Sequence, residues 1–193
     1  MNRSFSISSV FSATKNAMNL ATLDGIVAVN SAGNTGSFGS FTTSRTGLFL
    51  SVANGQEGGD VLSTHNRGGL SASSGRGPAF GVFHIKPDIT APGSSVRTLN
   101  HSGTGYTNAS GASLSAPVIT GVAALMVEAF PDAAPHEIIA RMMNTSRPIT
   151  FQAENSVFRA GAGFVQPRHA LDSEAFATVQ NFAGTRPTRR PQL

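Results

Sequence analysis

Ser113 is the residue of this chain whose type and surroundings could do chemistry. It lies in the run Gly111-Ala112-Ser113-Leu114-Ser115-Ala116-Pro117, at the start of an apolar stretch that reaches Val127. A hydroxyl at the N-terminus of a helix lies beside backbone N–H groups that have no partner, at the positive end of the helix dipole. Such a place would stabilise the oxyanion that forms when a serine attacks a carbonyl group. Most serines at helix starts only cap the helix, so this run alone favours a capping role.

An uncharged helix is expected to carry Ser113. Segment 103–127 contains no Asp, Glu, Lys or Arg, and from Ser113 onward it is rich in Ala, Val, Ile, Leu and Met. A helix that is apolar on all sides belongs in the middle of a protein, so we predict a helix over 113–130 that is buried on every side. Pro117 is tolerable only in the first turn, which places the start of the helix near Ser113.

The rest of the chain is typical of a parallel α/β sheet. Apolar spacing predicts a helix over 9–23, followed by a short buried strand at 26–29 and a Gly/Asn loop at 30–36. In such sheets ligands bind at the carboxyl ends of the strands, which is where this loop lies. The other elements that we expect are a strand at 48–52, irregular loops with short strands at 53–80, a rigid turn segment at 86–93, and helices at 135–144 and 167–171.

Composition excludes several classes of protein. The chain has 193 residues, of which 12% are charged and 21 are Gly, which favours one compact α/β domain, at 1–183. Without cysteine it has neither a disulfide framework nor a thiolate metal site. The net charge of +4 depends on a Pro/Arg-rich tail, 184–193, which we expect to be disordered, so nucleic-acid binding is not predicted. No apolar run reaches membrane-spanning length, and no signal peptide is visible.

Five separated segments carry motifs that belong together. They are VNSAGNTG at 29–36, SSGRGP at 73–78, KPDITAPG at 86–93, GASLSAP at 111–117 and GAG at 161–163. In this order they resemble the motifs of the subtilisin-like serine peptidases, or subtilases, and the resemblance covers the chain from Met1 to about Leu171. It implies a three-layer α/β fold with a mostly parallel sheet and helices on both faces, truncated at its N-terminal side.

The resemblance also assigns roles by position. Ser113 would be the nucleophile that forms an acyl-enzyme, although Ala112 stands where the family usually has threonine. Asn34 would donate its side-chain N–H to the oxyanion, whereas by itself it is only a loop asparagine next to glycine. Asp88 is expected to be structural. The substrate-binding residues that the resemblance implies are Ser4, Phe5 and Ser6 at the first strand, which would pair with substrate, and Ser31, Ala32 and Gly33 around the residue before the scissile bond.

The Asp and His of the subtilase triad are not found in this sequence. They are expected upstream of the strand at which the chain begins. The histidines all follow the Asn34 loop in no matching context, and the aspartates match no triad motif: His65, His84, His101, His136 and His169; Asp24, Asp60, Asp88, Asp132 and Asp172. Loss of the catalytic histidine alone costs about 10⁶ in turnover. We therefore expect the chain by itself to be inactive, with the missing N-terminal half of the same domain as its partner.

Two functions stay open at this point. The first is a subtilisin-like endopeptidase of polypeptides, which the resemblance places in the secreted or cell-envelope class. The second is an inactive fragment or pseudopeptidase that acts as a binding or structural module. Subtilases often bind calcium, but no run here has suitable ligand spacing, so no cofactor is predicted. Without its other half the chain is expected to expose a sheet edge and apolar surface, and to be poorly soluble.

Overall fold

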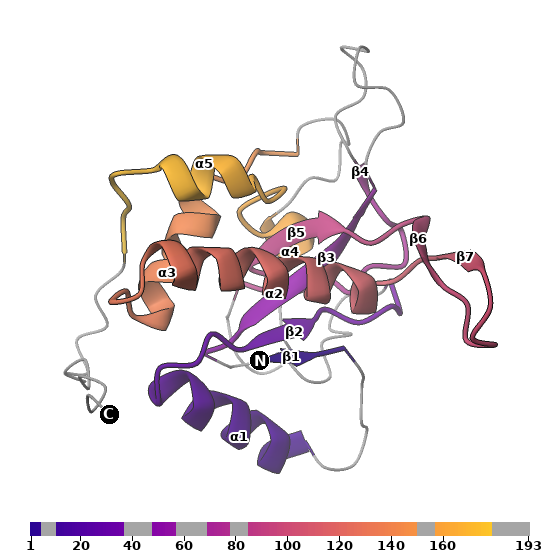
Figure 1. Ribbon diagram of the computed structural model, residues 1–193, viewed down its shortest axis with the longest axis horizontal. Coiled ribbons are helices and arrows are strands. Elements are labelled where there is room, and N and C mark those ends of the chain that lie inside the picture. The colour runs from indigo at the N-terminus through magenta and orange to yellow at the C-terminus, as the bar shows by residue number, and fades with distance from the viewer. Residues whose placement is uncertain (5–10, 37–47, 57–68, 78–84, 150–156, 179–193) are drawn as a thin grey trace.

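The central sheet of the protein is mostly parallel. The computed structural model describes residues 1–4, 11–36, 48–56, 69–77, 85–149 and 157–178. Within them, the parallel strands lie in the order β1 (Asn2–Arg3), β2 (Val29–Ser31), β3 (Leu50–Gln56) and β5 (Ile89–Pro92), as Figure 1 shows. β4 (Gly69–Leu70) pairs antiparallel with the end of β3. Val52 of β3 pairs with Ser31 on one side and with Ile89 on the other, which places β3 in the interior of the sheet.

Helices cover both faces of this sheet (Figure 1). α2 (Ala112–Ala129) crosses one face, and α3 (Pro135–Asn144) and α5 (Pro167–Asp172) pack beside it. α1 (Phe11–Leu23) covers the other face, where its Met18 packs against Ala28 and Phe49. The side chains of Ala28 and Phe49 lie on the opposite face of the sheet from those of Val29 and Leu50, because successive residues of an extended chain alternate between the two faces. The expected three-layer architecture is confirmed.

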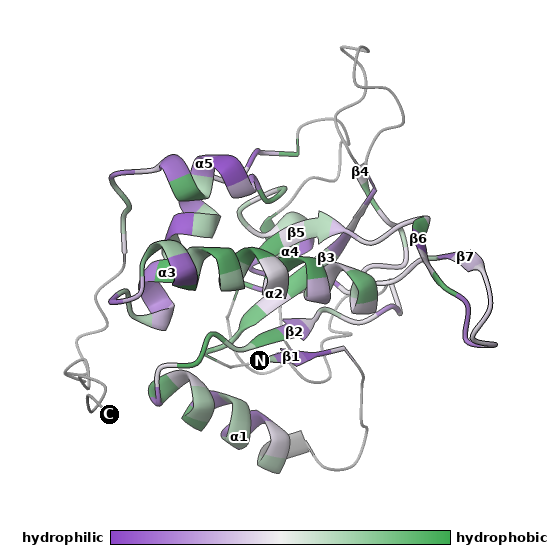
Figure 2. Ribbon diagram, in the orientation of Figure 1, coloured by the Kyte–Doolittle hydropathy of each residue, from purple (hydrophilic) through white to green (hydrophobic). Residues whose placement is uncertain are grey.

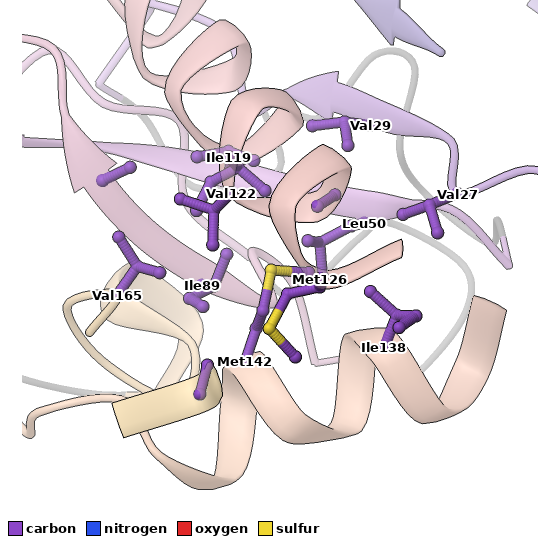
Figure 3. Close-up of a cluster of buried hydrophobic side chains, with 14 of the residues drawn as sticks. Val27, Val29, Leu50, Ile89, Ile119, Val122, Met126, Ile138, Met142 and Val165 are labelled. Carbon is purple, nitrogen blue, oxygen red and sulfur yellow. The ribbon is translucent and has the colours of Figure 1, made fainter. Parts of the chain in front are cut away.

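The main core lies between the sheet and α2 (Figure 3). Val29, Leu50 and Ile89 point from the strands toward Ile119 and its neighbours on α2. Figure 3 shows Met126 of α2 beside Met142 of α3, so the two helices share this core. On the other face of the sheet, Ala160 of α4 (Val157–Ala160) and Phe164 belong to a second buried cluster with Ala53.

α2 is buried on one side only, so the prediction of burial on every side is wrong. Val118 is 36% exposed and Leu125 is 50% exposed, whereas Ile119 and Met126 are fully buried. Hydrophobic residues line most of the helix (Figure 2). By length and composition alone α2 would pass as a membrane-crossing helix, whereas the sequence analysis expected no apolar run of that length. Its buried side packs on β2, β3 and β5, which is how the core helix of an α/β domain is placed.

Other elements differ from their predicted bounds. The segment 86–93 is not merely a rigid turn, because β5 forms within it: Pro92 stands at the last position of the strand, where a missing N–H is tolerated. A hairpin of β6 (Val96–Leu99) and β7 (Tyr106–Ala109) was not expected. The helix at 135–144 is confirmed, and that at 113–130 is confirmed within one residue. The tail at 184–193 lies outside the described residues.

Candidate active site

The loop after β2 presents Asn34 at the carboxyl edge of the sheet. β2 is buried throughout, and Ala32, which follows it, is also buried. Gly33 then turns the chain with a left-handed φ of 90°, a conformation that glycine adopts without strain. The Gly33 carbonyl accepts a hydrogen bond of 2.9 Å from the N–H of Gly75, which ties this turn to the segment after β4. The side chain of Asn34 is thereby held at the surface, where a ligand could reach it.

Ser113 lies in the first turn of α2 but does not cap it. The N-cap residue is Gly111, and no side chain caps this end of the helix. Ser113 is the second helical residue and is half-buried. The capping interpretation of Ser113 is therefore wrong, because its hydroxyl forms no capping hydrogen bond with the start of α2. Two N–H groups of this first turn have other partners, because Ala112 donates to Asn34 and Leu114 donates to the Gly111 carbonyl.

Asn34 and the start of α2 meet directly. The backbone N–H of Ala112 donates a hydrogen bond of 2.8 Å to Oδ1 of Asn34, across 78 residues of sequence. A carbonyl oxygen must face that N–H, so the Nδ2 group of the amide points to the other side. A Cβ placed on Gly111 would lie 3.1 Å from Ser113 Oγ and 3.2 Å from Asn34 Nδ2. Glycine at 111 therefore keeps open a small space that a hydroxyl and an amide donor share.

A buried polar layer lies directly beneath this turn. Gly93 donates its N–H to the carbonyl of Gly55 in β3 and accepts a hydrogen bond from the N–H of Gly111. A Cβ on Gly93 would overlap Ser115 Oγ and lie 2.7 Å from Asn54 Oδ1, so only glycine fits. Asn54 also accepts a hydrogen bond from the Ser94 hydroxyl. The sequence analysis treated Gly93 only as part of a turn. It missed Asn54, because no local sequence pattern around this residue indicates a role in the site.

Asp88 has a structural role, as predicted from the sequence. Its Oδ2 accepts hydrogen bonds of 2.6 Å from the Lys86 ammonium and from the backbone N–H of Ser51 in β3. The Lys86 ammonium also donates to the carbonyl of Phe49, at 3.1 Å, and both charged side chains are largely buried. This pair fastens the entry of β5 to the start of β3, at the end of the sheet opposite to Asn34.

The predicted substrate-binding residues are only partly described. Ser31 and Ala32 are buried behind Asn34, and Ala32 packs against Ala112, the residue before Ser113. Ser4 follows β1, which pairs with β2 alone among the described strands and so leaves one edge open. Burial lowers the pKa of the Arg3 guanidinium in this strand. Phe5 and Ser6 lie outside the described residues.

Comparison with known proteins now gives the family. The sequence pattern of the Peptidase_S8 subtilase family matches residues 1–163. The chain belongs to the subtilase family. It is 35% identical over 127 residues to subtilisin-like protease SBT3 of Solanum lycopersicum, covering 53% of this chain and 17% of that protein. It is 39% identical over 113 residues to subtilisin-like protease SBT3.16 of Arabidopsis thaliana, covering 51% and 15%.

Solved structures show the same fold. A protease structure from Pseudoalteromonas arctica matches with a TM-score of 0.67 and 28% identity, over 88% of this chain and 49% of that chain. The patellamide maturation protease PatA matches with a TM-score of 0.65 and 21% identity, over 86% and 58%. The chain thus spans about half the length of these subtilase-fold structures and about one sixth of the curated relatives.

The acid–base partners of the subtilase reaction are not found beside Ser113 in the part of the chain that the structure describes. His101, His136 and His169 are exposed there, and no hydrogen bond joins any of them to Ser113 or Asn34. His65 and His84 lie outside the described residues. Nor do three His, Asp or Glu side chains gather as metal ligands within the described ranges.

Proposed function

We propose that this chain supplies the nucleophile and the oxyanion-binding groups of a subtilisin-type serine endopeptidase that cleaves polypeptides. The observation that carries the proposal is the meeting of the Ser113 hydroxyl and the Asn34 amide nitrogen over Gly111. Membership of the subtilase family supports the same class of reaction.

In the proposed reaction, Ser113 Oγ attacks the carbonyl carbon of a peptide bond and its proton passes to a base. The carbonyl oxygen becomes an oxyanion, which accepts hydrogen bonds from the Asn34 side chain and the Ser113 backbone N–H. Collapse of this tetrahedral species breaks the C–N bond while the base gives its proton to the leaving amine, and an ester remains on Ser113 until water hydrolyses it. Because the Ala112 N–H already orients the Asn34 amide, the donor needs no rearrangement during the reaction.

The substrate would approach along the edge of the sheet. We propose that the residues before the scissile bond pair, as an added strand, with Ser4, Phe5 and Ser6, which follow β1 in the sequence. The residue next to the scissile bond would then lie against Ser31, Ala32 and Gly33. Because Ala32 and Gly33 are small, we expect this part of the site to admit a large apolar side chain of the substrate.

We propose that the base and its orienting carboxylate come from a polypeptide segment beyond these 193 residues, which packs on the outer face of α2. This face carries Pro117, Val118, Gly121 and Leu125, all exposed, on the helix whose first turn holds Ser113. A Cβ on Gly121 would meet nothing within 4 Å, so a neighbouring helix could approach closely there. The matched structures are about twice as long as their aligned parts, which is enough chain for such a segment.

Labelling with a fluorophosphonate tests this proposal, because the reagent reacts only with activated serines. The purified chain should not be labelled, since loss of the base alone costs about 10⁶ in turnover. The protein in its natural host should be labelled within the tryptic peptide 98–141, at Ser113 and not at Ser115. A Ser113→Ala variant is the control. Labelling of the purified chain would contradict an external base.

An inactive binding module is the second candidate, favoured by the lack of a histidine at Ser113 within the described ranges. It predicts that Ser113 stays unlabelled in the host as well as in the purified chain. It further predicts that the Ser113→Ala variant supports whatever the protein does in that host.

A further inference from the structure

The hairpin of β6 and β7 is a rigid extension of the turn that holds Ser113. Its pairing ends at Val96 and Ala109, and hydrogen bonds continue beyond it toward the sheet. The Ser95 N–H donates to Ser110 Oγ at 2.9 Å, and the Gly111 N–H donates to the Gly93 carbonyl at 2.8 Å. Movement of the hairpin is therefore restrained at the first turn of α2.

The two faces of the hairpin differ in burial. Leu99 pairs with Tyr106 and Arg97 pairs with Asn108, so these four side chains share one face, and all are exposed. Leu99 is 72% exposed and Tyr106 is 64% exposed. The other face carries half-buried Val96, Thr98 and Ala109. Two large apolar side chains thus stand on a restrained arm without a covering element among the described residues.

Arg97 adds a charge that has no counter-ion among the described residues. It is the only Lys, Arg, Asp or Glu between positions 89 and 127, and no ion pair joins it to any residue in the described ranges. Its guanidinium lies 5.0 Å from the centre of the Tyr106 ring, a cation–π contact that does not use its N–H donors. A carboxylate on a bound molecule would complement this group.

The order of the strands places the hairpin across Ser113 from β1. The sheet runs β1, β2, β3, β5; Asn34 follows β2, and the hairpin follows β5. An extended peptide that pairs with β1 and passes Asn34 and Ser113 therefore continues toward the hairpin. Figure 1 shows β1 on one side of the start of α2 and the β6–β7 hairpin on the other.

We propose that the face formed by Arg97, Leu99 and Tyr106 binds the part of a polypeptide substrate that follows the cleaved bond, with a preference for a large apolar residue beside an acidic one. This inference rests on the proposed function, because it takes Ser113 as the point of cleavage. Leu99 and Tyr106 receive the apolar side chain, and Arg97 pairs with the carboxylate.

Photo-crosslinking to the full chain tests the inference and needs no turnover. Two peptides contain the same reduced, uncleavable central bond. One carries benzoylphenylalanine just before that bond, and the other carries it two residues after the bond, next to a glutamate. We expect the first peptide to attach near residues 29–36 and the second to attach at Leu99 or Tyr106.

Variants separate this inference from the proposed function. Combined Leu99→Ser and Tyr106→Ser changes should lower crosslinking of the second peptide about tenfold and leave the first unchanged, whereas Val157→Ser, at a site 50% exposed in α4, should affect neither. Arg97→Glu should shift the preference of the second peptide from glutamate to lysine. If the first peptide attaches as expected but the second attaches elsewhere or ignores these changes, the hairpin inference is wrong. If neither peptide attaches near Ser113, the proposed function fails and the inference fails with it.

Discussion

The backbone N–H of Ala112 donates to Oδ1 of Asn34 at 2.8 Å and joins two loops that lie 78 residues apart. The oxygen of the Asn34 side chain thus has a structural role. The nitrogen of the same amide lies near the small space over Gly111 that the Ser113 hydroxyl also borders. Substitutions at this amide can therefore separate the structural role from the proposed chemical one.

Asn34→Asp and Asn34→Leu should separate these two roles. The aspartate variant keeps an oxygen for the Ala112 N–H but removes the donor, so we expect a fold as stable as the original. Its fluorophosphonate labelling in the host should be slower by roughly 10²–10³, the usual cost of one oxyanion-hole donor. The leucine variant should slow labelling equally and also lower the free energy of unfolding by about 1 kcal/mol, because a hydrogen bond is lost. Urea unfolding and labelling rates measure the two effects, and equal labelling of the Asn34→Asp variant and the original protein would exclude the donor role.

Three glycines should respond differently to alanine. Gly93→Ala makes a methyl group overlap Ser115 Oγ, so we expect a loss of about 1–3 kcal/mol in urea unfolding, typical of an overpacked core. Gly111→Ala intrudes by only a few tenths of an ångström between Ser113 and Asn34, and should slow labelling more than it lowers stability.

Gly121→Ala is the matched control for both changes. Its Cβ would meet nothing within 4 Å and it lies inside α2, where alanine is favoured over glycine by roughly 0.5–1 kcal/mol. The isolated chain should therefore become more stable. A destabilised Gly121→Ala chain would mean that the outer face of α2 is already covered.

The Lys86–Asp88 pair should be costly to break from one side. Lys86→Met leaves a largely buried carboxylate with the Ser51 N–H as its remaining partner among the described residues. Removal of one member of a buried pair costs about 3–5 kcal/mol. The double variant Lys86→Met/Asp88→Asn should lose less than the sum of the two single losses. Arg168→Met, in an exposed pair with Asp172, should leave the urea midpoint unchanged. Additive losses at positions 86 and 88 would show that the two side chains act independently.

The outer face of α2 should limit the solubility of the isolated chain. Val118→Ser and Leu125→Gln remove exposed apolar surface without touching the buried side of the helix, so aggregation measured by light scattering should fall while the unfolding midpoint changes little. The same two changes should weaken labelling in the host, if a further segment packs there. Ile119→Ser, on the buried side, should unfold the chain instead.

The fold could be predicted from the sequence where local patterns and neighbouring layers agree. The helix at 135–144 combines a proline at its start with an apolar stripe, and its predicted bounds are those of α3. The strand at 48–52 was found but extends to Gln56, because polar Asn54 and Gly55 are buried by packing that no local pattern reveals. β5 was missed because Pro87 before it and Pro92 at its last position are typical of turns.

The site could be predicted only through the order of its motifs. Ser113 and Asn34 are ordinary residues in their own surroundings, and the spatial link between them depends on a hydrogen bond across 78 residues. The prediction that α2 is buried on every side was wrong. The lack of charged residues indicates an apolar helix, but it does not indicate which of its faces the described part of this chain covers. The hairpin was missed although Gly103 and Gly105, between two runs with β-branched residues, are a turn signal that could have revealed it.

The hydrogen bond between the Ala112 N–H and Asn34 also determines at which stage the groups of the site become ordered. The dipoles that would face an oxyanion are oriented by folding of this chain alone, before any base arrives. A segment that docks on α2 would therefore add a proton acceptor to oxyanion-binding groups that are already oriented. Its binding free energy would not be reduced by the entropy cost of ordering those groups. Control of such a protein would rest on one event, the arrival of the acceptor.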